Sequence, residues 1–284
     1  MSKNVNWIIM ADPLEPPFKG GPLILHHLAN KFLSLGDRVL MNNPFHVGSE
    51  ELTIDFLNDK NNNLDEWVAI VTENDFRLEE FKLNNVVRYI LYKKQTDKNF
   101  NSNEFVIQYG NSFTMKTNYE FALSIKPVVT DLDFWKDLKK VRTNEFLILE
   151  KKGKNSQMKS LFKGRSIDNI INEIDTFNNI DLKLRDLFNE HKLFISFDND
   201  TFHSIQASLC GAISVVIPDG TQTEQEWRNS NKSRKWGIAY GFTIEQIKFA
   251  KETAHKLREF LHEEVKKGEK DLEILREIVL NKFY

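Results

Sequence analysis

A polar turn that joins two predicted elements is the first place where this sequence could do chemistry. The turn Ser196–Thr201 follows an apolar run, Leu193–Phe197, that predicts a β-strand, and it precedes a predicted helix. Thr201 is a candidate N-cap whose hydroxyl, with the free N–H groups of the helix start, could hold a phosphate. Asp198 and Gln206 could hydrogen-bond the hydroxyls of a sugar or a ribose. An ordinary capped helix explains the same residues at least as well.

Positive charge gathers just after another predicted strand, Phe146–Leu149. From Lys151 to Arg165 there are six cations and no acidic residue. Ligands of parallel sheets bind beyond the carboxyl ends of the strands, so one or two of these lysines could hold a diphosphate. A solvated basic loop is the competing interpretation.

A pair of glycines, Gly20 and Gly21, lies between the first predicted strand, Asn4–Met10, and a predicted helix that begins near Pro22. Glycines let the backbone approach a ligand, and the start of a helix favours anions. The segment is neither G-x-G-x-x-G nor a P-loop, so it predicts no dinucleotide site of those kinds. A plain tight turn is the alternative.

Two histidines, a glutamate and the single cysteine are the further residues whose types could serve chemistry. His26 and its neighbour His27 open the first predicted helix, where adjacent side chains point about 100° apart, so at most one faces a ligand. Glu73 is better placed, at the end of the predicted strand Trp67–Thr72, although a buried or capping role is common for such a carboxylate. Cys210 is expected to be a small core residue.

The elements that would position these residues form an α/β pattern. Short apolar strands alternate with amphipathic helices, which predicts doubly wound, Rossmann-like parallel sheets. We expect two domains, residues 1–127 and residues 128–284, with the ligand in the cleft between them. Two long helices, about 243–266 and 270–283, are predicted to end the chain, and the segment Trp236–Phe242 is interpreted as a tight apolar turn.

Composition narrows the classes of function. The chain has 284 residues, and its 39 basic and 41 acidic residues give a net charge of −2, which argues against a nucleic-acid partner. One cysteine makes no internal disulfide, and no Cys/His set has zinc spacing, so a reducing compartment and no bound metal are expected. The apolar run Trp7–Ala11 is too short for a signal sequence or a membrane span. We therefore expect a soluble, cytoplasmic protein.

Taken together, the segments resemble glycosyltransferases of the GT-B fold, and most closely the bacterial surface-polysaccharide (capsule or O-antigen) type. The segment Gly20–Leu40 is similar to the family's glycine loop, first helix and second strand. Leu193–Gly220 is similar to its nucleotide-sugar segment, and the KKGK run at Lys151–Lys154 lies where such enzymes carry a cation for the donor diphosphate. The resemblance covers most of the chain.

The resemblance implies a hexosyltransferase-type enzyme that moves a sugar from a nucleotide-sugar donor to a glycan or lipid-linked glycan, without a metal cofactor. The donor would lie on the second domain and the acceptor on the first, and the last helix would return to the first domain. The resemblance implies that Lys152, Thr201 and Ser196 hold the diphosphate of the donor. It implies that Gln206 binds the ribose and that the sugar lies near Gly20 and Gly21. Asp198 completes the implied donor-binding set.

The sequence departs from the family at one point. Many retaining members carry two glutamates separated by seven residues, whereas the same spacing here holds Asp198 and Gln206. Retention of stereochemistry is therefore unsupported, and an inverting reaction needs a general base near the acceptor hydroxyl. The candidate bases on the first domain are Asp12, Glu15, His26 and Glu73.

Two other functions remain open: a non-catalytic protein that binds a sugar or nucleotide, and a nucleotide-sugar epimerase on the same scaffold. The altered acids at positions 198 and 206 favour the former. The basic stretches Lys151–Arg165 and Lys232–Lys235 also suggest peripheral contact with the inner membrane face, where a lipid-linked acceptor would lie.

Overall fold

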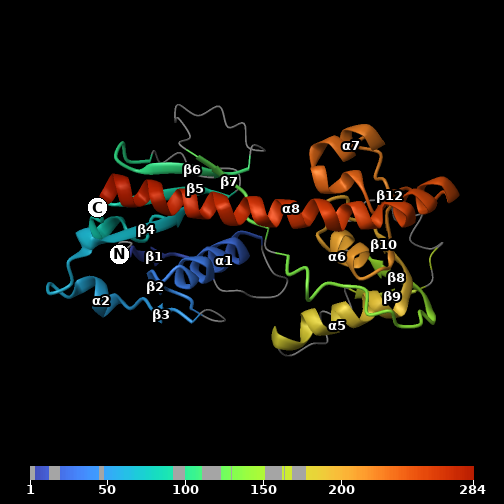
Figure 1. Ribbon diagram of the computed structural model, residues 1–284, viewed down its shortest axis with the longest axis horizontal. Coiled ribbons are helices and arrows are strands. Elements are labelled where there is room, and N and C mark those ends of the chain that lie inside the picture. The colour runs from blue at the N-terminus through green and yellow to red at the C-terminus, as the bar shows by residue number, and fades with distance from the viewer. Residues whose placement is uncertain are drawn as a thin grey trace. The chain divides into compact units, whose positions relative to one another are not determined.

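The computed structural model describes residues 4–12, 20–44, 48–91, 100–110, 123–128, 130–150, 162, 164–167 and 177–284. The chain divides into two compact units. Unit 1 holds Met1–Val129 and Glu264–Tyr284, and unit 2 holds Thr130–Glu263. The last helix, α8 (Ile244–Phe283), contributes its first half to unit 2 and its second half to unit 1 (Figure 1).

Unit 1 is built on a parallel sheet of seven strands in the order β3-β2-β1-β4-β5-β6-β7. From β1 the chain adds strands toward one edge, and from β4 it adds them toward the other edge. The order in which strands are added therefore reverses between β1 and β4, and this reversal is called below the change of strand direction. The strands are β1 (Asn6–Ile9), β2 (Arg38–Met41), β3 (Glu50–Glu51), β4 (Trp67–Thr72), β5 (Val86–Ile90), β6 (Phe105–Tyr109) and β7 (Leu123–Ile125).

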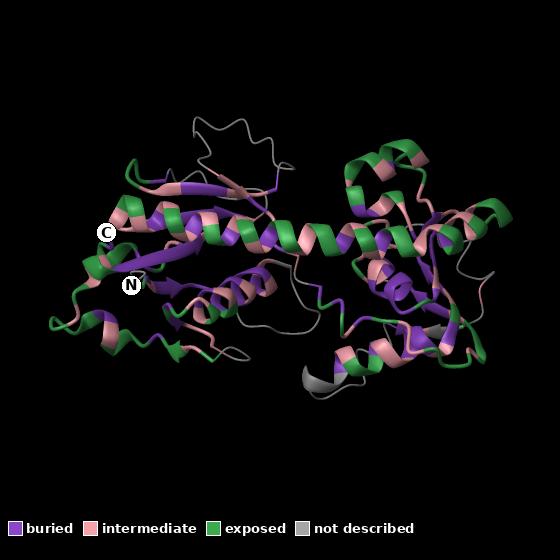
Figure 2. Cartoon of the chain, viewed as in Figure 1, coloured by how far each residue is buried: buried purple, intermediate pink, exposed green. Residues whose placement is uncertain are grey.

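Alternate side chains of these strands point to opposite faces of the sheet and pack into two separate hydrophobic cores. Trp7 and Ile9 of β1 face one side, where α1 (Gly20–Ser34) and the second half of α8 pack, and the Trp7 ring stacks on Phe32 of α1 at 4.2 Å. Ile8 and the neighbouring strands' alternate residues face the other side, which α2 (Ile54–Asn58) covers. Both faces of the central strands are therefore buried, as Figure 2 shows for β1 and β4.

Unit 2 is built on a second parallel sheet, of five strands in the order β12-β11-β10-β8-β9. Its change of direction lies between β8 and β10, which pair with Leu149 opposite Ser196. The strands are β8 (Asn144–Leu149), β9 (Arg165–Ser166), β10 (His191–Ser196), β11 (Ile213–Val216) and β12 (Ile238–Tyr240). The helices are α5 (Phe177–Glu190), α6 (His203–Leu209) and α7 (Glu224–Ser230), followed by a 3-10 turn, η3 (Lys232–Lys235).

The prediction of an α/β protein with parallel sheets is confirmed, and two local predictions are wrong. The two final helices are one continuous helix, α8. The segment interpreted as an apolar turn contains strand β12. The first helix begins at Gly20 and holds Pro22 in its first turn, as predicted. Within the described ranges, no helix is both long enough and apolar enough to cross a membrane.

Gly268 explains the wrong helix boundary. A glycine between two helical patterns reads as a stop signal, yet here it lies inside α8. A Cβ built on Gly268 would lie 3.0 Å from Pro127 Cα and 3.3 Å from the Lys126 carbonyl oxygen. The glycine thus lets α8 pass close to the segment after β7 instead of ending the helix.

Candidate functional site

The two changes of strand direction mark where ligands of such sheets bind, just beyond the carboxyl ends of the strands. In unit 2, Phe197 N donates to Leu149 O at 3.0 Å, so the chain leaves β10 directly beside the end of β8. The KKGK run follows β8 at once, but Lys152 lies outside the described residues. What the structure describes at this edge is the turn after β10.

That turn is held by its own side chains. Ser196 Oγ donates to Asp198 O at 2.9 Å and accepts from Asp198 N at 3.0 Å. Asp198 Oδ1 accepts from Asp200 N at 2.9 Å. Two of the predicted donor-binding positions, Ser196 and Asp198, are therefore brought together, with the Ser196 hydroxyl bonded to the backbone and Ser196 wholly buried.

The helix after the turn begins differently from the prediction. The N-cap position is Phe202, without a side-chain cap, and Thr201 Oγ1 accepts from His203 N at 3.3 Å. Thr201 therefore closes a short turn just before α6 instead of capping it. Gln206, predicted to bind ribose, is 7% exposed, and its Oε1 lies 2.7 Å from His203 Nδ1.

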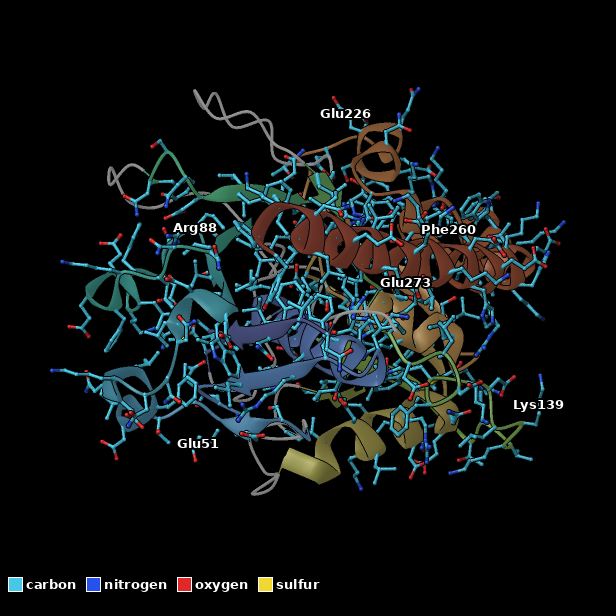
Figure 3. All side chains as sticks on the ribbon, turned by 60° about the vertical axis from the view of Figure 1, so that its left-hand side comes forward. Glu51, Arg88, Lys139, Glu226, Phe260 and Glu273 are labelled. Carbon is cyan, nitrogen blue, oxygen red and sulfur yellow. The ribbon has the colours of Figure 1, made fainter. Side chains whose placement is uncertain are left out.

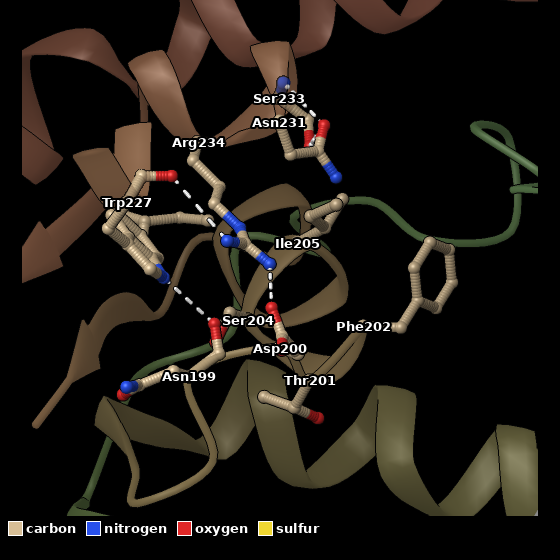
Figure 4. Close-up of a pocket in the computed structure, with 11 residues that line it drawn as sticks. Asn199, Asp200, Thr201, Phe202, Ser204, Ile205, Trp227, Asn231, Ser233 and Arg234 are labelled. Atoms are coloured by element: carbon tan, nitrogen blue, oxygen red, sulfur yellow. Dashed lines mark hydrogen bonds and ion pairs between the residues drawn. The ribbon is translucent and has the colours of Figure 1, made fainter. Parts of the chain in front are cut away.

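A pocket opens beside this turn, within unit 2 (Figure 4). It holds about 370 Å³ of space that no atom fills, part of it open to solvent. The turn supplies Asn199, Asp200 and Thr201, the start of α6 supplies Ser204, and the opposite wall comes from α7 and η3. Of these, only Thr201 was predicted as a site residue.

The charged group of the pocket is an ion pair. Arg234 of η3 donates to Asp200 Oδ1 and, through Nη1, to Ser230 Oγ at 2.6 Å. Its guanidinium carbon lies 5.1 Å from the centre of the Trp227 ring, and Trp227 Nε1 donates to Asn199 O at 2.9 Å. Figure 4 shows the guanidinium between Trp227 and Asp200. Arg234 was seen in the sequence as part of a basic stretch, and nothing local marked its partner 34 residues earlier.

In unit 1, candidate residues follow the two strands at the change of direction. Asp12 follows β1 and its side chain is 70% exposed, with Oδ1 3.8 Å from Arg77 Nη2. Glu73 follows β4, is buried, and accepts from Leu91 N at 2.9 Å. Of these two carboxylates, only Asp12 is open to a substrate.

Arg77, which the sequence analysis did not identify, is held in place by the side chain of Asp75. Its Nε donates to Asp75 Oδ1 at 2.9 Å, and its Nη2 donates to Asp75 Oδ2. The hydrogen bond with Asp75 raises the pKa of the guanidinium further and outweighs the effect of burial. Its partner Asp75 is itself buried, so Arg77 is presented toward Asp12 in a fixed orientation.

A buried arginine holds the backbone that follows β4. Arg88 of β5, labelled in Figure 3, makes a bidentate pair with Glu104, with Nε–Oε2 2.7 Å and Nη2–Oε1 2.8 Å. Its Nη1 donates to the carbonyls of Thr72 and Asp75. Arg88 therefore fixes the backbone that carries Glu73 and Asp75.

The remaining predicted residues are buried, paired or part of α1, or they lie outside the described ranges. His26 is 4% exposed within α1, whereas His27 pairs with Glu269 at 3.1 Å. Gly20 and Gly21 are the first residues of α1, and a Cβ on Gly21 would make an ordinary 3.5 Å contact with Leu91. Glu15 is not among the described residues. Cys210 is fully buried, and burial raises the pKa of its thiol to about 12.

Among the described residues, no group of three or more His, Cys, Asp or Glu side chains is arranged to hold a metal ion. The polar groups of the unit 2 pocket are instead hydroxyls, amides and the ion pair of Arg234 with Asp200. The expectation that no metal cofactor is needed stays a prediction.

Comparisons with known proteins find likeness in fold. No family model matches, and no curated protein matches the sequence. A solved glycosyltransferase from Rickettsia africae ESF-5 is similar over 99% of this chain and 95% of that chain, with 10% identity and a TM-score of 0.46. The glycosyltransferase SnogD from Streptomyces nogalater is similar over 98% of this chain and 100% of that chain, with 10% identity and a TM-score of 0.43. Both TM-scores lie below 0.5, and neither likeness assigns this chain to a family.

Proposed function

We propose that this protein is a glycosyltransferase that moves a sugar from a nucleotide-sugar donor to a glycan or lipid-linked glycan in polysaccharide synthesis. The observation that carries the proposal is that the chain holds two parallel sheets, each with a change of strand direction. Polar candidate residues follow the strands at both places. One ligand site per sheet suits a reaction with two substrates.

We assign the donor to unit 2. The turn after β10 offers Thr201 beside the end of β8, and the KKGK run follows β8 in the sequence. Lys152 would neutralise the diphosphate as it leaves, which is the task that a metal ion performs in other transferases. The polar turn at this edge, together with the basic run that comes next after β8 in the sequence, supports this assignment.

We assign the acceptor and the general base to unit 1. Asp12 is the exposed carboxylate at that edge, whereas Glu73 and His26 are buried. In the proposed step, Asp12 takes the proton of an acceptor hydroxyl, and the oxygen forms a bond to the anomeric carbon of the donor sugar. The bond from that carbon to the diphosphate oxygen breaks, and its electron pair leaves with the nucleoside diphosphate. A single displacement of this kind inverts the configuration.

The test is a thermal-shift series with UDP, GDP, CMP, dTDP and several of their sugars, without added metal. A ligand at about 100 times its Kd stabilises the folded state by about 2.7 kcal/mol, which raises Tm by a few degrees. We expect one nucleotide to be selected. The shift should be lost in Lys152→Ala and kept in Lys248→Ala, a control whose lysine pairs with Glu252 on α8.

The same series separates the alternatives. Absence of a shift with every nucleotide at millimolar concentration would contradict the proposal and favour a non-catalytic sugar-binding protein. An epimerase would consume the donor without an acceptor and yield an isomeric nucleotide sugar, which chromatography of the reaction detects.

We further propose that the enzyme works in the cytoplasm, at the membrane face. The exposed Lys232 and Lys235 could contact anionic lipid there. Co-sedimentation with anionic vesicles at low salt tests this contact.

A further inference from the structure

We infer that the pocket between the start of α6 and η3 binds one neutral sugar ring of a nucleotide-free saccharide, apart from the donor groups. The inference concerns unit 2 alone and does not depend on the proposed transfer reaction. The pocket's 370 Å³ of unfilled space includes open solvent, so its enclosed part is smaller still. A single ring, and not a whole nucleotide sugar, suits that size.

Two buried polar atoms of residues that line the pocket have no hydrogen-bond partner among the described residues. They are Ser204 Oγ, in a residue that is 2% exposed, and Asn199 Oδ1. A buried polar group without a partner costs about 1–3 kcal/mol. A sugar hydroxyl both donates and accepts, so one hydroxyl can satisfy either group.

The charges of the pocket favour a neutral ligand. Arg234 is already neutralised by Asp200, whose side chain is 80% exposed at the rim. A phosphate or carboxylate entering the pocket would meet that carboxylate and would have no proton to donate to Asn199 Oδ1. Hydroxyls can donate to Asp200 and accept from Arg234 at once.

The aromatic groups argue against a nucleotide base. Trp227 is 1% exposed, and Arg234 covers one face of its ring. Phe202, 41% exposed, is the remaining aromatic side chain of the lining. The buried Trp227 ring therefore offers a base no open face to stack on, whereas a sugar ring needs only a small apolar surface and several polar groups.

The pocket and the predicted donor groups lie on different faces of α6. Ser204 and Ile205 line the pocket, whereas Gln206, about 200° around the helix from Ser204, contacts His203. Ser196 and Asp198 bond to the turn itself. Thr201 alone belongs to both sets, so a saccharide here is a second ligand beside the donor, such as a unit of the glycan chain.

The experiment uses the whole protein, five neutral probes and one charged probe, each to about 100 mM. The neutral probes are the methyl glycosides of glucose, galactose, mannose, rhamnose and N-acetylglucosamine, and the charged probe is methyl glucuronide. Saturation-transfer NMR detects such weak binding directly. We expect at least one glycoside to bind, Ser204→Ala to weaken it about fivefold or more, and Ser204→Leu to abolish it by filling the pocket. Ser208→Ala is the matched control, because Ser208 lies one turn further along α6, is also buried without a partner, and does not line the pocket.

Four results would overturn the inference: no binding by any glycoside, equal weakening by Ser204→Ala and Ser208→Ala, stronger binding of methyl glucuronide than of methyl glucoside, or displacement of the sugar by a nucleotide that binds. Ser204→Ala and Ser208→Ala should have a Tm at or above the wild-type value, because each removes a buried hydroxyl without a partner, so a lost signal is not lost folding. If no nucleotide binds and a glycoside still does, the transfer proposal fails and the saccharide pocket stands.

Discussion

Arg276, near the end of the chain, closes a bidentate ion pair on Asp37, which precedes the second strand. Arg276 Nη2 lies 2.7 Å from Asp37 Oδ1, and Nε lies 2.8 Å from Oδ2. The Asp37 side chain is wholly buried and also accepts from Val5 N and Trp7 Nε1, both at 3.0 Å. One carboxylate thus joins the first strand, the second strand and the last helix of unit 1.

We predict that Asp37→Ala lowers the free energy of unfolding by about 3–5 kcal/mol, because it removes the buried carboxylate that pairs with Arg276 and accepts from Val5 N and Trp7 Nε1. Urea denaturation followed by circular dichroism measures this. Glu50→Ala is the control, since its exposed pair with Arg38 should be worth less than about 1 kcal/mol. Equal effects of the two variants would show that the Asp37 cluster is not a stabilising centre.

Lys31 should make stability depend on alkaline pH. Burial alone lowers its pKa, but hydrogen bonds with Glu269 and Glu273 outweigh burial, so the pKa is raised from the usual 10.5. The stabilisation is present in full below the unfolded pKa and is lost as pH rises through the folded one. The difference in unfolding free energy between wild type and Lys31→Met, about 1 kcal/mol at neutral pH, should hold up to about pH 10.5 and shrink as the pH rises further. A difference that stays constant above that pH would contradict the prediction.

The choice of Asp12 as general base can be separated from binding. Once a donor and acceptor are known, Asp12→Asn should lower kcat by about 10²–10⁴ and leave the thermal shift by nucleotide unchanged. Glu73→Gln keeps an oxygen for Leu91 N and should retain kcat within about tenfold. The reverse order of effects would make Glu73 the base.

Cys210 should be unreactive in the folded protein. Burial raises the pKa of its thiol to about 12, so almost no thiolate exists near neutral pH. We expect iodoacetamide at about pH 7.5 to leave the folded protein unmodified by mass spectrometry and to label it once after unfolding in guanidinium. Rapid labelling of the folded protein would disprove the buried environment.

Gly268→Ala should destabilise the protein, although alanine is favoured over glycine by about 1 kcal/mol in a helix interior. The added methyl group would meet backbone atoms of Pro127 and Lys126, which cannot move away as a side chain could. Thermal unfolding measures the sign. A rise in Tm would mean that α8 is free to shift away from residues 126–128.

Elements with a strong local pattern were predictable. Arg38–Met41 and Trp67–Thr72 match strands β2 and β4, because runs of buried apolar residues specify central parallel strands. Strand β5 gave no such signal, since it carries Arg88 in its middle. That arginine is buried only because Glu104, 16 residues later, and the rings of Phe76 and Phe100 surround it.

The candidate site was predictable only along single segments. The turn after β10 could be identified because its polar residues are consecutive. The pocket could not, because its walls meet through contacts such as Trp227 with Asn199 and Arg234 with Asp200, which join residues about 30 positions apart. A sequence pattern records what neighbours in the chain do, whereas this pocket depends on which surfaces pack together.

The discontinuity of unit 1 has a consequence for synthesis on the ribosome. Residues 130–263 form one uninterrupted segment, so unit 2 can fold as soon as that segment has emerged. Unit 1 needs Leu272, Leu275 and Val279 for its core and Arg276 for the buried Asp37. Its first 129 residues must therefore wait, with that apolar face uncovered, until the whole of unit 2 and the last helix have been translated, which makes them the natural client of a ribosome-bound chaperone.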